Sequence, residues 1–98
     1  MEIGGKSYTL TALTNYYSAS FSDNADSTTG PPSASYAEVA LDNGYLLTSE
    51  APGTRPLFSF TRVYNDSHTD TATFASTAGI AWAAQNGYSN VGTLGWLL

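Results

Sequence analysis

The chain has no cysteine among its 98 residues. Disulfide bonds and thiolate zinc sites are therefore excluded, and a small fold must depend on its apolar core or on partners. Only three residues are basic against eight acidic ones, which gives a net charge of −5. Nucleic-acid binding needs several Lys or Arg side chains, so no nucleic-acid partner is expected. Anionic membranes are disfavoured for the same reason.

Long apolar runs are also missing, since none approaches the roughly 20 residues that cross a bilayer. Residues 1–5, "MEIGG", lack the basic start and following apolar run of a signal peptide. Charged residues make up only 11% of the chain, whereas about 25% is usual. Ser and Thr supply the polar surface instead. This composition favours a virion, extracellular or cell-surface location.

The residues that are present can form a core, because 42% are hydrophobic and 13% aromatic. The length predicts a single domain over residues 1–98. Strands are predicted where apolar residues alternate with polar ones, as in "SYTLTAL" and "LFSFTRVYN". In the latter, Phe58, Phe60, Arg62 and Tyr64 share one face, and Leu57, Ser59, Thr61 and Val63 share the other. Further strands are predicted at Tyr17–Phe21, Tyr45–Glu50, His68–Phe74 and Asn90–Leu98.

The chain also repeats itself: "ALDNGY" starts at Ala40 and "AAQNGY" at Ala83, 43 positions later. Before the first copy, Ser35 and Glu38 have the spacing of a capping box. Gly44 can adopt the left-handed conformation that ends a helix. A short helix is therefore predicted at about 35–43.

A second helix is predicted before the second copy. Ser76 or Thr77 can cap it, apolar residues recur on one face, and Gly87 can end it. Gly79 weakens it by up to about 1 kcal/mol relative to Ala. The alternative for both copies is that Asn-Gly forms a type I′ hairpin turn.

These elements predict an α+β fold that is mostly β. It consists of two strand–strand–short helix–strand repeats, 7–50 and 55–98, that share one core. The second half resembles a tyrosine-rich repeat of unknown function found in tandem in secreted and surface proteins. "RPLFSFTRVYN", "SHTDT", "AAQNGY" and "GTLGWLL" follow the order of that repeat, whereas the first half matches only through "ALDNGY". The resemblance implies adhesion or glycan contact, with no established activity.

One group of residues could bind a metal ion. Asp66, His68 and Asp70 share one face if the segment is a strand, and two carboxylates with an imidazole suit a divalent cation. The alternative is a structural role at a solvated hairpin, with the His forming hydrogen bonds. No nucleophile elbow accompanies the Ser residues, so neither an enzyme nor a cofactor is expected. Residues 22–30, "SDNADSTTG", lack the spacing of a calcium loop and are predicted to form a solvated turn.

The aromatic residues divide into two classes. Phe58, Phe60, Trp82 and Trp96 are expected in the core, since a small domain needs its largest side chains inside. A tyrosine suits a sugar or a protein interface, because it combines a flat apolar ring with a hydroxyl. The candidate contact residues are Tyr16, Tyr17, Tyr36, Tyr45 and Tyr88, together with Trp96 and Leu97 of the C-terminal strand.

Two functions follow from this composition. The first is a non-catalytic structural or assembly protein that works through protein–protein contacts, such as a virion decoration or coat-associated subunit. Its partners are protein neighbours in a homo-oligomer or larger assembly. The alternative is a glycan-binding module at a cell surface or outside the cell.

Overall fold

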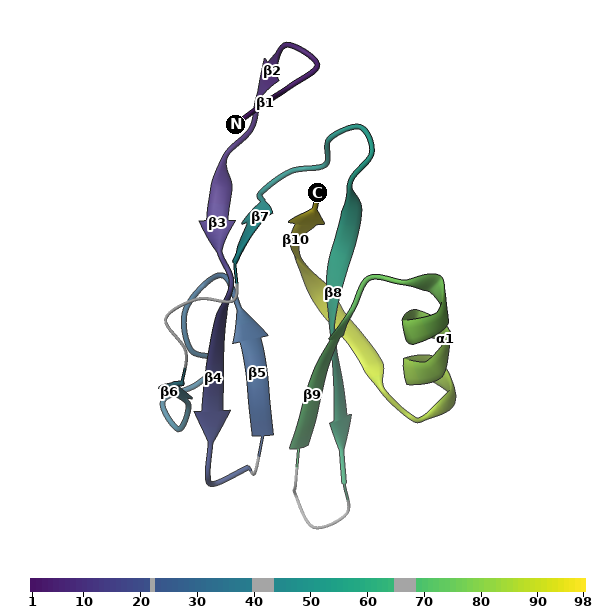
Figure 1. The fold of residues 1–98 in the computed structure, drawn as a ribbon. Coiled ribbons are helices and arrows are strands. Elements are labelled where there is room, and N and C mark those ends of the chain that lie inside the picture. The colour runs from purple at the N-terminus through teal and green to yellow at the C-terminus, as the bar shows by residue number, and fades with distance from the viewer. Residues whose placement is uncertain (22, 40–43, 65–68) are drawn as a thin grey trace.

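The computed structural model describes residues 1–21, 23–39, 44–64 and 69–98. Within these ranges the protein is built mostly from strands, with one short helix (Figure 1). The helix α1 spans Thr77–Gln85. The strands are β1 (Glu2–Ile3), β2 (Lys6–Ser7), β3 (Leu10–Ala12), β4 (Thr14–Ser18), β5 (Asp23–Ser27), β6 (Ala37–Glu38), β7 (Tyr45–Leu47), β8 (Arg55–Val63), β9 (Thr69–Phe74) and β10 (Ser89–Leu97). The prediction of a mostly β, α+β fold is thus confirmed.

The strands form two main sheets and a small hairpin. The larger sheet has the order β3-β7-β10-β8-β9, the smaller has the order β5-β4-β6, and β1 pairs with β2. The N-terminal hairpin projects beyond the sheets at the top of Figure 1. The molecule is thin and elongated, with extents of 50 × 30 × 15 Å.

The alternation predicted for β8 is confirmed, and it gives the large sheet two different faces. Phe60 is buried, and its ring contacts Phe74 of β9 edge-on at 5.8 Å, while Phe74 contacts the α1 ring Trp82 at 5.9 Å. This is the α1 face. Leu57 and Ser59 lie on the opposite face, which is turned toward the smaller sheet.

Helix α1 forms where the second copy of the repeated sequence predicts it. The Ser76 hydroxyl caps the helix by accepting a hydrogen bond from the Gly79 amide at 3.0 Å. Gly87 follows the helix with a positive φ of 80°. Gly79 is tolerated inside the helix because a Cβ there would lie 2.6 Å from the Phe74 ring. The residue that costs helix propensity therefore allows α1 to sit close against β9.

The helix predicted at 35–43 is wrong over the residues that the structure describes. Ala37 and Glu38 form β6 instead, paired with Tyr17 and Tyr16 of β4. Ser35 does not cap a helix, because its hydroxyl lies 3.0 Å from that of the buried Ser18. So short a helix gains little without tertiary packing, and pairing with β4 prevails. Residues 40–43 lie outside the described residues.

Two apolar clusters hold the large sheet, one on each face. The N-terminal cluster consists of Tyr8, Leu47 and Ala51, with Ile3 and Trp96 packed against it. The central cluster consists of Leu13, Leu46 and Leu57, with Ala75, Leu94 and Leu97 packed against it. Each cluster draws residues from both halves of the chain.

Trp82 does not belong to the core, contrary to the expectation for it. Half of its surface is exposed. Its ring packs on Phe74 and on Tyr88, at centroid distances of 5.9 and 5.7 Å. No described element covers the outer side of α1, so the ring is left open to solvent. Phe60 is buried as predicted, while Phe58 and Trp96 are half-buried.

Helix α1, the single helix of the described residues, is nine residues long. It is not long and apolar enough to cross a membrane.

Candidate functional site

The two sheets meet edge to edge at β5 and β9, and a buried carboxylate joins them. Asp23 of β5 is only 1% exposed. Its Oδ1 accepts a hydrogen bond from the Thr71 amide at 2.6 Å, and its Oδ2 accepts one from the Thr71 hydroxyl at 2.7 Å. The Tyr36 hydroxyl donates to the same Oδ2 at 2.7 Å. Three donors therefore compensate for the burial of this side chain.

Asp26 makes a second contact between the same strands. Its Oδ2 accepts a hydrogen bond from the Thr73 hydroxyl at 3.1 Å, and its Oδ1 accepts one from the Asn15 amide at 3.0 Å. The Thr69 amide also donates to the Phe21 carbonyl at 3.4 Å. The two sheets are therefore connected mainly by hydrogen bonds to side chains, whereas backbone hydrogen bonds connect the strands within each sheet.

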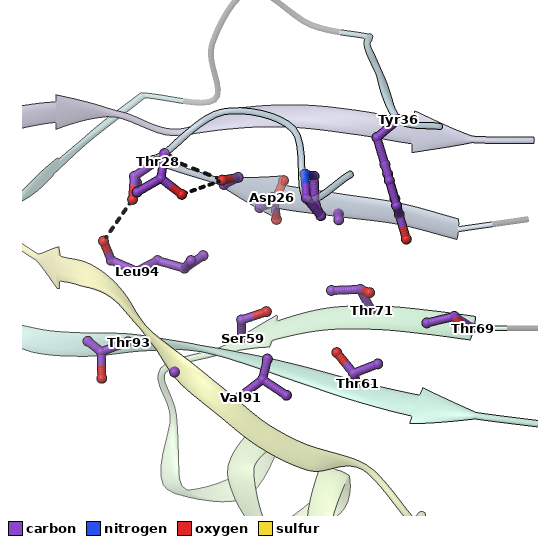
Figure 2. A pocket seen from close by; sticks show the side chains of 15 residues that line it. Asp26, Thr28, Tyr36, Ser59, Thr61, Thr69, Thr71, Val91, Thr93 and Leu94 are labelled. Atoms are coloured by element: carbon purple, nitrogen blue, oxygen red, sulfur yellow. Dashed lines mark hydrogen bonds between the residues drawn. The ribbon is translucent and has the colours of Figure 1, made fainter. Parts of the chain in front are cut away.

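Beside this junction the sheets diverge and leave a cleft of about 400 Å³ (Figure 2). One wall comes from β5 and the segment after it, and the other comes from β8, β9 and β10. The Thr28 hydroxyl bridges the walls at one end by donating to the Leu94 carbonyl at 3.3 Å. The lining residues are Ala25, Asp26, Ser27, Thr28, Thr29, Pro32, Tyr36, Ser59, Thr61, Thr69, Thr71, Val91, Gly92, Thr93 and Leu94.

The cleft is lined by hydroxyl groups and carries one acidic side chain, Asp26. Nine of its 15 lining residues are Ser, Thr or Tyr, and none is Lys or Arg. The rest are small or apolar. Such a surface can donate and accept hydrogen bonds at many points but offers no cation to hold an anionic group.

Tyr36 links the cleft to the junction. Burial, together with the hydrogen bond to the Asp23 carboxylate and its negative charge, raises the pKa of Tyr36 from 10.0 to about 12. Phe21 stacks on the Tyr36 ring at a centroid distance of 6.1 Å. The ring is therefore held both at its hydroxyl and on one face.

The raised pKa of Tyr36 predicts a loss of stability in alkali. Because the folded-state pKa lies above the ordinary value, the stabilisation is fully present below about pH 10 and is lost as the pH rises through about 12. We expect the stability difference between the native protein and Tyr36→Phe to shrink over that range. Urea unfolding at a series of pH values measures it. Tyr17→Phe, at an exposed tyrosine, is the matched control, and a Tyr36→Phe difference that does not change with pH would contradict the prediction.

The candidate metal site has one member within the described residues. Asp70 accepts a hydrogen bond from the Tyr88 hydroxyl, and it lies opposite Arg62 in the β8–β9 ladder. Asp66 and His68 lie outside the described residues. Elsewhere, the parts of the chain that the structure describes contain no group of three or more His, Cys, Asp or Glu side chains placed to hold a metal ion.

Tyr88 stands at the end of a row of rings on the α1 face. The row runs from Phe60 through Phe74 and Trp82 to Tyr88. The hydrogen bond to Asp70, with burial and the Asp70 charge adding to it, holds the pKa of Tyr88 well above its usual range. Arg62 donates a hydrogen bond to the Asn86 carbonyl at 3.0 Å, and its guanidinium lies over the Tyr64 ring. Asp70 and Tyr88 thus form a side-chain pair that the sequence pattern did not associate.

The five candidate contact tyrosines do not gather on one surface. Tyr16 is 9% exposed and faces inward, whereas its neighbour Tyr17 is 41% exposed. Tyr36 lines the cleft, and Tyr88 lies half-buried beside α1. Tyr45 is 60% exposed on β7. Only Tyr17 and Tyr45 are therefore presented freely to solvent.

The C-terminal residues end in a strand, as predicted. Trp96 packs against the N-terminal cluster and Leu97 against the central cluster, so the two side chains lie on opposite faces. Both are half-buried by the protein's own chain, and β10 lies inside the sheet between β7 and β8. Leu98 is 70% exposed.

Apart from Tyr36, sequence reasoning missed the residues that build the junction and the cleft. The segment predicted as a solvated turn contains β5, with Asp23 and Ala25 buried. Buried and less buried positions alternate along β5, with Asn24 exposed between Asp23 and Ala25, but the hydropathy of the residues does not alternate. A stretch reading Asp-Asn-Ala-Asp-Ser therefore carries no pattern by which a strand could be recognised.

The chain matches no protein-family model, no curated protein and no solved structure. The resemblance of its second half to the tyrosine-rich repeat stays a prediction.

Proposed function

We propose that the protein is a non-catalytic structural protein that works through contacts with protein neighbours, in a homo-oligomer or a larger assembly. One observation carries this proposal: two large apolar side chains, Leu10 and Tyr45, stand exposed at the open side of the large sheet. Their exposed fractions are 44% and 60%.

The sheet register places these two side chains together. Leu10 pairs with Leu47, and Ala12 pairs with Tyr45. Residues two apart on a strand share a face, so Leu10 and Tyr45 are diagonal neighbours on the same face. Leu47 belongs to the N-terminal cluster, which means that the exposed pair continues the surface of a buried cluster.

The edge of the sheet beside this pair has little protection. β3 is the terminal strand of the large sheet, and its sequence, Leu-Thr-Ala, contains neither charge nor proline. Charges and prolines are among the devices that keep edge strands from pairing with other chains. At the opposite edge, β9 is joined to β5 through Asp23 and Asp26. β3 is thus the edge that a neighbouring chain could extend.

The shape of the molecule supports the same proposal. Its radius of gyration is 14.4 Å, whereas about 12.6 Å is expected for a compact domain of this length. An elongated plate exposes more surface than a compact domain, and covering it with neighbouring subunits removes apolar area from water. Together with the low charge, this supports a virion decoration or coat-associated subunit, or a comparable protein at a cell surface.

We propose in addition that the two halves of the chain are repeats that share one core. Residues 7–50 supply β3 and β7 to the large sheet, and residues 55–98 supply β8, β9 and β10. Both halves contribute to each apolar cluster, which supports a common core. The helix belongs to the second half alone among the residues described.

We expect the native protein to self-associate at micromolar concentration, and Tyr45→Lys to shift it toward the monomer by at least tenfold in dissociation constant. A lysine placed in an apolar contact must be desolvated, which weakens the interface. Sedimentation equilibrium gives both constants. Val63→Lys replaces an apolar residue that is 70% exposed, against 60% for Tyr45, and lies away from β3, and it should leave association unchanged. The proposal would be contradicted if the native protein stayed monomeric at every concentration and no protein partner were found for it in its source.

A further inference from the structure

We infer that the cleft between the two sheets binds a neutral saccharide of about one or two sugar units. The cleft lies on the face of the large sheet opposite to Leu10 and Tyr45, because Ser59 and Thr61 face it from β8 while the register places the exposed pair on the α1 face. The inference therefore stands apart from self-association.

Ser59 is the first reason to regard the cleft as a binding site. The residue is only 8% exposed and lines the cleft, and Figure 2 shows its side chain directed into the space between the sheets. Its hydroxyl has no hydrogen-bond partner among the described residues, yet none of their fully buried polar side-chain atoms lacks a partner. The Ser59 oxygen must therefore open onto the cleft. Only a water molecule or a ligand inside the cleft can satisfy it.

Two more hydroxyl groups are available on the same wall. Thr61 and Thr69 line the cleft on the same face as Ser59, and their hydroxyls form no hydrogen bonds within the described part of the chain. They differ in this from Thr71 and Tyr36, whose hydroxyls are used at the junction. Each free hydroxyl donates one hydrogen bond and accepts up to two. A ligand whose own groups also donate and accept, such as a polyol ring, matches this wall.

The other lining residues suit the carbon skeleton of a sugar. Val91 and Leu94 add apolar contact on the β10 side. Tyr36 adds an aromatic ring that is already oriented by Asp23 and Phe21. A ring fixed in advance loses little conformational entropy when a ligand packs on it.

Charge and topology argue against other ligands. Asp26 is the charged lining residue and no lining residue is basic, so phosphates, sialic acids and uronic acids would meet repulsion without a compensating cation. A peptide strand would need a free sheet edge to pair with. The β5 and β9 edges next to the cleft face each other, and β8 and β10 are interior strands. The volume of about 400 Å³ is near the lower end for ligand clefts, which suits a small saccharide.

The test is an NMR titration of the full chain with neutral monosaccharides and disaccharides, including glucose, galactose, mannose, N-acetylglucosamine and their common dimers. We expect at least one of them to shift the amide signals of β8, β9 and β10 around Ser59, Thr61 and Thr93, with dissociation in the millimolar range or tighter. Sialic acid and glucuronic acid serve as acidic probes and should bind at least tenfold more weakly.

Isosteric variants then test the hydroxyl wall. Thr61→Val removes a hydroxyl without changing the shape of the side chain, and we expect it to weaken binding by about 3- to 10-fold. Thr48→Val makes the same change at an exposed position outside the cleft and should have no effect. Val91→Trp, at a residue that is 62% exposed, should obstruct the cleft and abolish binding without unfolding the protein.

Several results would overturn the inference. One is the absence of any shift at cleft residues with every neutral sugar up to ~100 mM, well above a millimolar dissociation constant. Another is binding that survives both Thr61→Val and Val91→Trp. Shifts centred on Trp82 and Tyr88 would place the sugar on the α1 face instead. Tighter binding of the acidic probes would contradict the charge argument.

Discussion

Replacing Asp23 with alanine is expected to lower the free energy of unfolding by about 3 kcal/mol. The variant leaves the Thr71 amide, the Thr71 hydroxyl and the Tyr36 hydroxyl without their acceptor. The Asp23 side chain is almost fully buried, so the alanine variant leaves a void at the junction between β5 and β9 in which these donors have no protein acceptor. Urea unfolding followed by tryptophan fluorescence measures the change.

A second readout connects this result to the geometry of the junction. Without the Asp23 carboxylate, the pKa of Tyr36 should fall from about 12 toward 10.0, and absorbance titration of tyrosine detects that fall. Asn24→Ala, at the exposed neighbour on β5, is the control and should cost less than about 1 kcal/mol. If Asp23→Ala were as stable as this control, the carboxylate would not be what joins the sheets.

Deleting Trp96–Leu98 is expected to cost about 4–6 kcal/mol, a large share of the roughly 5–15 kcal/mol by which a typical domain is stable. Trp96 leaves the N-terminal cluster and Leu97 leaves the central cluster, so both faces of the large sheet lose packing at once. The deletion also removes the Trp96–Leu47 bridge between β10 and β7. Near-UV circular dichroism should show loss of fixed tertiary structure in the truncated chain.

Deletion of Leu98 alone is the matched control. That residue is 70% exposed and follows the last residue of β10, so its loss should change stability by less than about 0.5 kcal/mol. A chain lacking Trp96–Leu98 that keeps a native near-UV spectrum and a cooperative transition would show that the core does not need its C-terminus.

Local sequence pattern determined much of the second half of this protein. The alternation in β8 specifies which side chains meet α1 and which face the smaller sheet, because successive residues of a strand point to opposite faces. Ser76 and Gly87 mark the ends of α1 for reasons internal to a helix: an oxygen that caps free amides and a residue that tolerates positive φ. These signals act between near neighbours and can be read without knowing the fold.

Tertiary structure decided the first half and the candidate site. Ser35 and Glu38 have the spacing of a capping box, but Ala37 and Glu38 pair with β4, since a strand partner about 20 residues away satisfies more backbone groups than one marginal helical turn. Asp23 lies in a stretch with the composition of a solvated turn, yet it is buried against Thr71, 48 residues away. A carboxylate is buried only when enough donors converge on it. Which donors converge depends on how the two sheets dock, and no spacing along the chain records that arrangement.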